Sequence, residues 1–112
     1  MVHQQQFKDK LLNIINQNIH CEALDNVFLA RQLCMSEASF YRAVKKTFNL
    51  SPNQLIRRQR LCRAESILTT STATSVREAA YSVGFSHVGY FIRRYEEFFG
   101  HRPGERVSTG LC

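Results

Sequence analysis

Apolar residues recur along this chain at intervals of three and four, the spacing that gathers side chains on one face of an α-helix. Leu11, Ile15 and Ile19 show the pattern near the start of the chain. The pattern predicts six helices, which cover residues 5–19, 26–34, 37–48, 52–68, 76–82 and 87–99. Because each helix has an apolar face to bury, we expect them to pack together in an all-α fold.

Short polar residues stand just before several of these helices, where their side chains can accept hydrogen bonds from unpaired backbone N–H groups. Asp25 precedes the second helix and Ser36 the third. Ser51–Pro52 places a capping residue ahead of a proline at the first helical position. Ser75, with Glu78 three residues later, has the spacing of a capping box.

The stretch from Asp25 to Pro52 occurs twice. Ahead of its internal turn the two copies align 50 residues apart, as Ser36 does with Ser86. Beyond the turn they align 51 residues apart, as Arg42 does with Arg93. One residue inserted near the start of the last helix accounts for the change, so the chain carries an internal repeat.

Each copy consists of a short helix, a turn and a longer helix. The turns are predicted at Cys34–Met35 and at Val83–Phe85, where Gly84 suits a left-handed backbone conformation. Ser86 is expected to open the last helix as Ser36 opens the third. Two helix-turn-helix units joined by the helix from Pro52 follow from this order.

The net charge is +6, and seven of the fifteen basic residues lie between Arg42 and Arg63 with no acidic residue among them. Such a block favours a polyanionic partner. Charge alone does not separate this interpretation from a solvated helix face.

The four cysteines lie at positions 21, 34, 62 and 112 and form no CxxC or Cys/His zinc spacing, so we expect no metal and no cofactor. Cys34 and Cys62 are predicted to be small core residues, and all four to be free thiols. The chain lacks an apolar run that could span a bilayer and lacks a secretory signal, which favours a cytoplasmic protein without membrane contact.

The second helix of a helix-turn-helix enters the major groove and reads base edges, so residues 37–48 and 87–99 are the candidate recognition helices. In the first, Arg42 is suited to guanine and Ala38 to a thymine methyl group. The competing interpretation pairs Arg42 with Glu37 or Glu65. The complete set of candidate DNA-binding residues is Ser36, Ala38, Ser39, Tyr41, Arg42, Lys45, Lys46, Arg57, Ser86, His87, Val88, Gly89, Ile92 and Arg93.

Within this set we expect different roles. Lys45 and Lys46 are assigned to phosphates, and Ser36 and Ser86 to helix capping, to phosphate contact, or to both. The second recognition helix offers few hydrogen-bonding groups besides Arg93, so the first copy is predicted to carry most of the base specificity. The connecting helix spans on the order of 25–30 Å. This length suits two recognition helices that contact DNA about one turn apart, roughly 34 Å.

These features resemble the DNA-binding domain of the AraC/XylS family of bacterial transcription regulators. The resemblance rests on ordered pieces of the chain, which include Phe40–Arg42, Leu50–Pro52 and the run from Ala80 to Ser86. It implies seven helices, made of a first subdomain (5–50), a linker helix (51–71), a second subdomain (72–107) and a flexible tail (108–112). It also implies promoter DNA as partner, a linked sensing or receiver domain outside this chain, and a contact with RNA polymerase.

The chain departs from the family pattern in the second copy. Glu96–Glu97 stands where basic residues are common, and Val88 and Gly89 replace polar base-readers. A protein-interaction module of the same fold with weak DNA affinity therefore stays open as an alternative. An enzyme is not expected, because the sequence shows no paired carboxylates, no nucleophile with its base and no glycine-rich phosphate loop.

Overall fold

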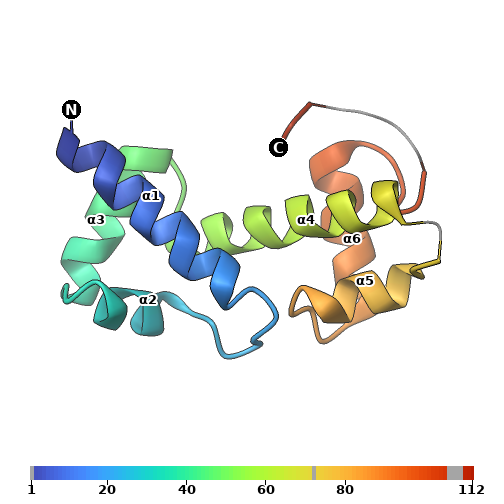
Figure 1. Ribbon diagram of the computed structural model, residues 1–112, viewed down its shortest axis with the longest axis horizontal. Helices are drawn as coiled ribbons and strands as arrows, with labels where there is room; N and C mark the ends of the chain where they lie inside the picture. The colour runs from blue at the N-terminus through green and yellow to red at the C-terminus, as the bar shows by residue number, and fades with distance from the viewer. Residues whose placement is uncertain (1, 72, 106–109) are drawn as a thin grey trace. The chain divides into compact units, whose positions relative to one another are not determined.

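The computed structural model describes residues 2–71, 73–105 and 110–112, and these residues form α-helices without any β-strand (Figure 1). The helices are α1 Val2–Gln17, α2 Asn26–Gln32, α3 Glu37–Phe48, α4 Pro52–Thr70, α5 Val76–Ser82 and α6 Val88–Phe99. The predicted all-α class is confirmed. The described residues contain six helices rather than the seven implied by the resemblance, and residues 106–109 lie outside the described part.

The chain divides within α4 into two compact units, Met1–Gln59 and Arg60–Cys112. Each unit contains one copy of the repeat. The division falls inside the predicted linker helix, and the predicted subdomain borders at residues 50 and 72 remain predictions.

The core of the first unit is largely aliphatic. In it α2 packs against α3, and α1 packs against α2 (Figure 1). The most deeply buried side chains of this unit are Leu11, Ile15, Leu29, Phe40, Val44 and Leu55. Burial of these apolar faces stabilises helices that are too short to persist alone in water.

The second unit has an aromatic core, formed where α5 packs against α6. The ring of Phe91 lies 5.1 Å from Phe85 and 5.6 Å from Tyr95, and Tyr95 lies 4.4 Å from Phe99, measured between centroids. Ala79 and Ala80 are fully buried, and their small size lets the two helices approach closely. One apolar face of α6 is therefore committed to packing, which leaves the opposite face to solvent.

Most of the predicted helix caps are present. Asp25 Oδ1 accepts from the Phe28 N–H at 2.9 Å, and Ser36 Oγ accepts from the Ser39 N–H at 3.2 Å. Ser75 and Glu78 form a complete capping box. These bonds satisfy N–H groups that the first turn of a helix leaves unpaired.

Backbone hydrogen bonds before and after the turn locate the inserted residue of the second copy. The turn bond from Met35 N–H to the Ala30 carbonyl (2.9 Å) recurs 50 residues later, from Phe85 to Ala80 (3.0 Å). The first helical bond from Phe40 to Ser36 (2.9 Å) recurs 51 residues later, from Phe91 to His87 (3.0 Å). The extra residue is therefore Ser86.

This register corrects the expectation that Ser86 caps α6. The N-cap residue is His87, whose side chain makes no capping hydrogen bond. The insertion displaces Ser86 by one position, out of reach of the role that Ser36 has in the first copy. Gly84, by contrast, has the predicted left-handed conformation, with φ 92°.

The cysteine predictions are wrong for three of the four residues. Cys62 and Cys112 form a disulfide across 50 residues of sequence, so neither is a free thiol. Cys34 is a free thiol but is exposed rather than buried, in the turn ahead of α3 with φ 57°. The left-handed turn position of Cys34 leaves its side chain at the surface, although its sequence neighbours are apolar.

None of the helices described has the length and apolar content needed to cross a membrane. Nor do the described residues bring together three or more side chains that could hold a metal ion.

Candidate nucleic-acid interface

Helix α3 has a buried back and an exposed, basic front. Phe40 and Val44 are fully buried, which fixes the orientation of the helix within its unit. The exposed predicted site residues on or just before α3 are Ser36, Ala38, Tyr41, Arg42, Lys45 and Lys46, and Ser39 is half-buried. The structure thus brings the seven candidates of the first copy together on one exposed segment.

Arg42 is held by its own helix rather than by an acidic partner. Its Nη2 donates to Ser39 Oγ at 3.4 Å. Within the first unit, the described residues show no ion pair between Arg42 and Glu37, and the pairing with Glu65, which belongs to the second unit, stays a prediction. The Arg42 guanidinium remains exposed and retains most of its N–H donors for a ligand.

The basic residues of α4 differ in how freely they can reach a ligand. The guanidinium of Arg58 lies over the Phe48 ring, 5.9 Å from its centroid, and the Lys8 ammonium lies over the same ring at 5.9 Å. These cation–π contacts tie α1 and α4 to the end of α3. Arg57, the predicted site residue, is half-buried on α4, and its DNA contact remains a prediction.

Helix α6 offers a smaller and less polar front. His87 and Gly89 are exposed, and Val88 is half-buried. A Cβ added at Gly89 would meet nothing within 4 Å, so packing within the protein does not require glycine there. Two roles for Gly89 therefore stay predictions: it allows DNA to approach the backbone closely, or it merely weakens base readout.

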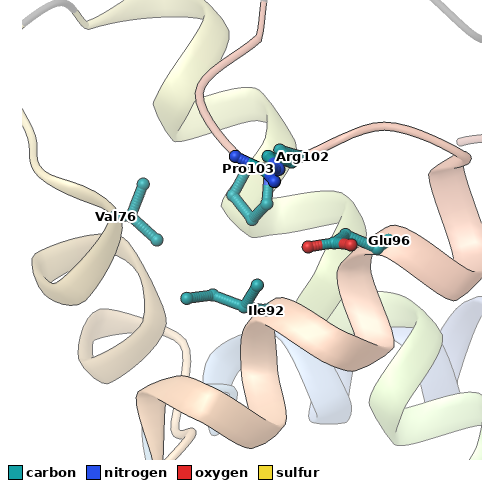
Figure 2. Close-up of a pocket in the computed structure, with 5 residues that line it drawn as sticks. All are labelled: Val76, Ile92, Glu96, Arg102 and Pro103. Atoms are coloured by element: carbon teal, nitrogen blue, oxygen red, sulfur yellow. The ribbon is translucent and has the colours of Figure 1, made fainter.

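Ile92 lies in a shallow pocket rather than on the open front. The pocket has a volume of about 290 Å³ and is lined by Val76, Ile92, Glu96, Arg102 and Pro103 (Figure 2). Figure 2 shows the Ile92 side chain directed toward Val76 and Pro103, with Glu96 on the other side of the pocket. Contact of Ile92 with a base therefore remains a prediction. The alternative is that its side chain serves packing in this pocket.

Arg93, the next residue, is exposed, with its guanidinium carbon 5.7 Å from the centroid of the Tyr90 ring. The guanidinium of Arg94 lies at 5.1 Å from the same centroid. A hydrogen bond to Tyr90 is the main cause that raises the pKa of Arg94, and its bond to Glu97 adds to the rise. Tyr90 is thus in contact with two arginines, although it is not among the candidate site residues.

The acidic pair of α6 is partly neutralised. Arg94 Nη1 lies 3.0 Å from Glu97 Oε2, so the charge of Glu97 is balanced within the helix. Glu96 is exposed at the edge of the Ile92 pocket. The acidic character expected to weaken phosphate contacts is therefore concentrated at one residue instead of two.

Tyr95 is a core residue and not part of this front. It is fully buried, and its hydroxyl has no hydrogen-bond partner. Burial, with a smaller contribution from the charge of Glu65, raises the pKa of Tyr95 to about 12. The phenol therefore stays neutral in the folded protein at any physiological pH.

The fold and its two exposed recognition helices define a class, and comparison with known proteins identifies it. Residues 29–107 match a protein-family model described as a helix-turn-helix domain. A probable AraC family transcriptional regulator from Rhodopseudomonas palustris is 30% identical, with TM-score 0.74, over 86% of this chain and 89% of that one. The chain therefore belongs to the AraC/XylS family of helix-turn-helix domains, as the resemblance predicted.

Two further relatives are named as regulators of transcription. The XylDLEGF operon transcriptional activator 2 of Pseudomonas putida is 28% identical over 89% of this chain and 64% of its own length. The DNA-binding domain of AdpA, solved in complex with a target DNA, is 26% identical with TM-score 0.77, covering 85% of this chain and 84% of that one. The family is one of transcription regulators and not a class of enzymes.

The chain covers less than two thirds of the length of these curated relatives: 64% of the Pseudomonas putida activator and 7% of another protein.

Proposed function

We propose that this chain binds double-stranded promoter DNA in a sequence-specific manner, with α3 and α6 in successive major-groove segments. The observation that carries the proposal is the repeated construction of the two units. In each, a recognition helix buries an aromatic residue, Phe40 or Phe91, and exposes an arginine two residues later, Arg42 or Arg93. A helix fixed by its back and basic on its front can enter the major groove without rearranging the core.

Arg42 is the principal base reader in this proposal, because its planar fork matches the O6 and N7 acceptors of guanine. Lys45 and Lys46 follow it on the exposed face and contact phosphates. The front of α6 has Arg93 as its strong donor, so the second unit contributes mainly affinity. The two bound elements are expected about one helical turn apart, roughly 34 Å.

The chain acts in this proposal as the output domain of a larger regulator in the cytoplasm, where bacterial DNA lies. Its match to only part of each curated relative supports a linked sensing or receiver domain. The Pseudomonas putida relative is named as a transcriptional activator, which supports a role for this chain in activating transcription. Activation in turn supports a contact with RNA polymerase.

Selection of bound duplexes from a random pool tests the proposal and supplies the site. We expect two short elements separated by about one turn, and an affinity that falls steeply with salt as counterions are released from phosphates. Enrichment of no sequence, together with a salt-independent affinity, would instead favour a protein-interaction module.

Substitution of the two arginines tests the division of roles. Arg42→Ala should cost on the order of 1–3 kcal/mol and relax discrimination at one base pair. Arg93→Ala should weaken binding more uniformly across mutated sites. If Arg93→Ala relaxes base discrimination more than Arg42→Ala does, the assignment is reversed.

Gly89→Ala separates folding from DNA contact. The added methyl group meets no protein atom within 4 Å, and alanine favours a helix over glycine by about 1 kcal/mol. We expect the variant to be at least as stable as the parent but weaker in DNA binding. Unchanged affinity would show that DNA does not approach the backbone at Gly89.

A further inference from the structure

The exposed arginine of each recognition helix has a partner three residues earlier on the same helix. In α3, Ser39 Oγ accepts from Arg42 Nη2 at 3.4 Å. In α6, the Tyr90 ring centroid lies 5.7 Å from Arg93 Cζ. Residues at this spacing are neighbours on a helix surface, so the contact does not depend on any other element.

The two partners occupy the same place in the repeat. Beyond the turn the copies align 51 residues apart, as the bonds from Phe40 and Phe91 to the N-cap carbonyls show. This offset pairs Arg42 with Arg93 and Ser39 with Tyr90. The repeat has thus retained the arginine and a contact to it, while the chemistry of the contact differs between the copies.

Holding an arginine matters because the side chain is long and loses rotamer freedom when it is fixed by a ligand. A neighbour that restricts the guanidinium beforehand reduces that loss. The Ser39 hydroxyl uses one N–H of five, and a ring beneath the guanidinium uses none, because the N–H groups point outward in its plane. Either contact leaves a fork that can still meet a base edge or a phosphate.

We propose that Ser39 and Tyr90 are positioning residues, which place Arg42 and Arg93 for contact with DNA. The inference rests on the proposed function. Tyr90 is itself restrained, since its ring also lies 5.1 Å from Arg94, which is bonded to Glu97 at 3.0 Å. Glu97, Arg94 and Tyr90 thereby form a continuous support for Arg93 along one face of α6.

Double-mutant cycles on the selected duplex test the first pair. Ser39→Ala should weaken specific binding roughly two- to fivefold, and the loss should disappear when Arg42 is already alanine. Ser39→Thr, which retains the hydroxyl, should preserve affinity. Ser66→Ala, which changes an exposed serine of α4, is the matched control and should leave binding unchanged.

The second pair is tested by separating the ring from its hydroxyl. Tyr90→Leu should weaken binding roughly two- to fivefold, and Tyr90→Phe should preserve it, because the ring is what supports Arg93. The effect of Tyr90→Leu should vanish in an Arg93→Ala background. Tyr81→Leu removes a tyrosine that is 48% exposed on α5 and serves as control.

The outcomes separate this inference from the proposed function. If Arg42→Ala and Arg93→Ala leave affinity for the selected duplex unchanged, the proposed function fails. If they weaken binding while Ser39→Ala and Tyr90→Leu do not, the positioning roles are wrong and the proposed function stands. The positioning roles are also overturned if Ser39→Ala and Tyr90→Leu weaken DNA binding by the same factor when the neighbouring arginine is already alanine. They are likewise overturned if the loss of affinity is accounted for by a lower thermal stability of the free variant.

Discussion

Opening the Cys62–Cys112 disulfide should destabilise the second unit more than any single side-chain substitution on its surface. The bond joins residues 50 positions apart, and this loop encloses nearly all of the unit from Arg60 to Cys112. Cys112 is exposed, so an external thiolate can reach its sulfur. Cys112→Ser removes the bond without changing a buried residue.

The expected magnitude follows from the size of the loop. Closing a loop of 50 residues removes about 4 kcal/mol of chain entropy from the unfolded state at 25 °C in the loop-closure treatment. That loss lowers the ratio of folded to unfolded protein about a thousandfold. If both units unfold together as one cooperative chain of 112 residues, it corresponds to a fall of roughly 15–20 °C in Tm.

Tyrosine fluorescence during urea denaturation reports this effect selectively. The chain has no tryptophan and four tyrosines, of which Tyr81, Tyr90 and Tyr95 lie in the second unit. Reductant and Cys112→Ser should lower the urea midpoint equally, and reductant should not act further on the variant. Cys34→Ser, which changes a free exposed thiol, should respond to reductant as the parent does.

Two results would refute the reasoning. Unfolding free energies of parent and Cys112→Ser that agree within about 0.5 kcal/mol would show that the loop is already constrained in the unfolded chain. A reductant effect that persists in Cys112→Ser would place the sensitive bond elsewhere.

Three other changes have expected effects on stability. Cys34→Gly should raise the unfolding free energy by about 1 kcal/mol, because φ 57° at Cys34 strains any residue with a Cβ; unchanged thermal unfolding would contradict this. Tyr95→Phe should be neutral or stabilising, since it removes a buried hydroxyl without a partner. Since the pKa of Tyr95 rises from 10.0 to about 12 on folding, the unfolded chain ionises first, and the parent should lose up to about 2 kcal/mol between pH 10 and 12. Denaturation at alkaline pH should show no such loss in Tyr95→Phe. Ser75→Ala should cost about 1 kcal/mol in urea denaturation by removing the capping box, and an unchanged midpoint would show that the cap is not needed.

Much of the fold could be predicted from the sequence because its determinants are local. The predicted bounds of α3 and α5 agree with the structure, since a capping serine marks the start of each and an apolar periodicity its extent. The internal repeat could also be recognised from the sequence, because its two copies share capping and apolar residues at nearly constant offsets. Left-handed backbone at Gly84 follows from the one residue type that accepts it without strain.

The candidate site was predictable only in part. Exposure of Arg42 and Arg93 follows from helical spacing relative to the buried Phe40 and Phe91. Tyr90, three residues before Arg93, was missed, although the spacing of three was a signal available in the sequence.

The sequence by itself determined the all-α class, the two helix-turn-helix copies and the basic front of α3, because these depend on neighbours within a few residues along the chain. Tertiary structure decided that Ile92 lines a pocket with Val76 and Pro103, and that Cys62 meets Cys112. These contacts join segments far apart in the chain, and their distances depend on how the side chains of the second unit pack, which no local pattern records.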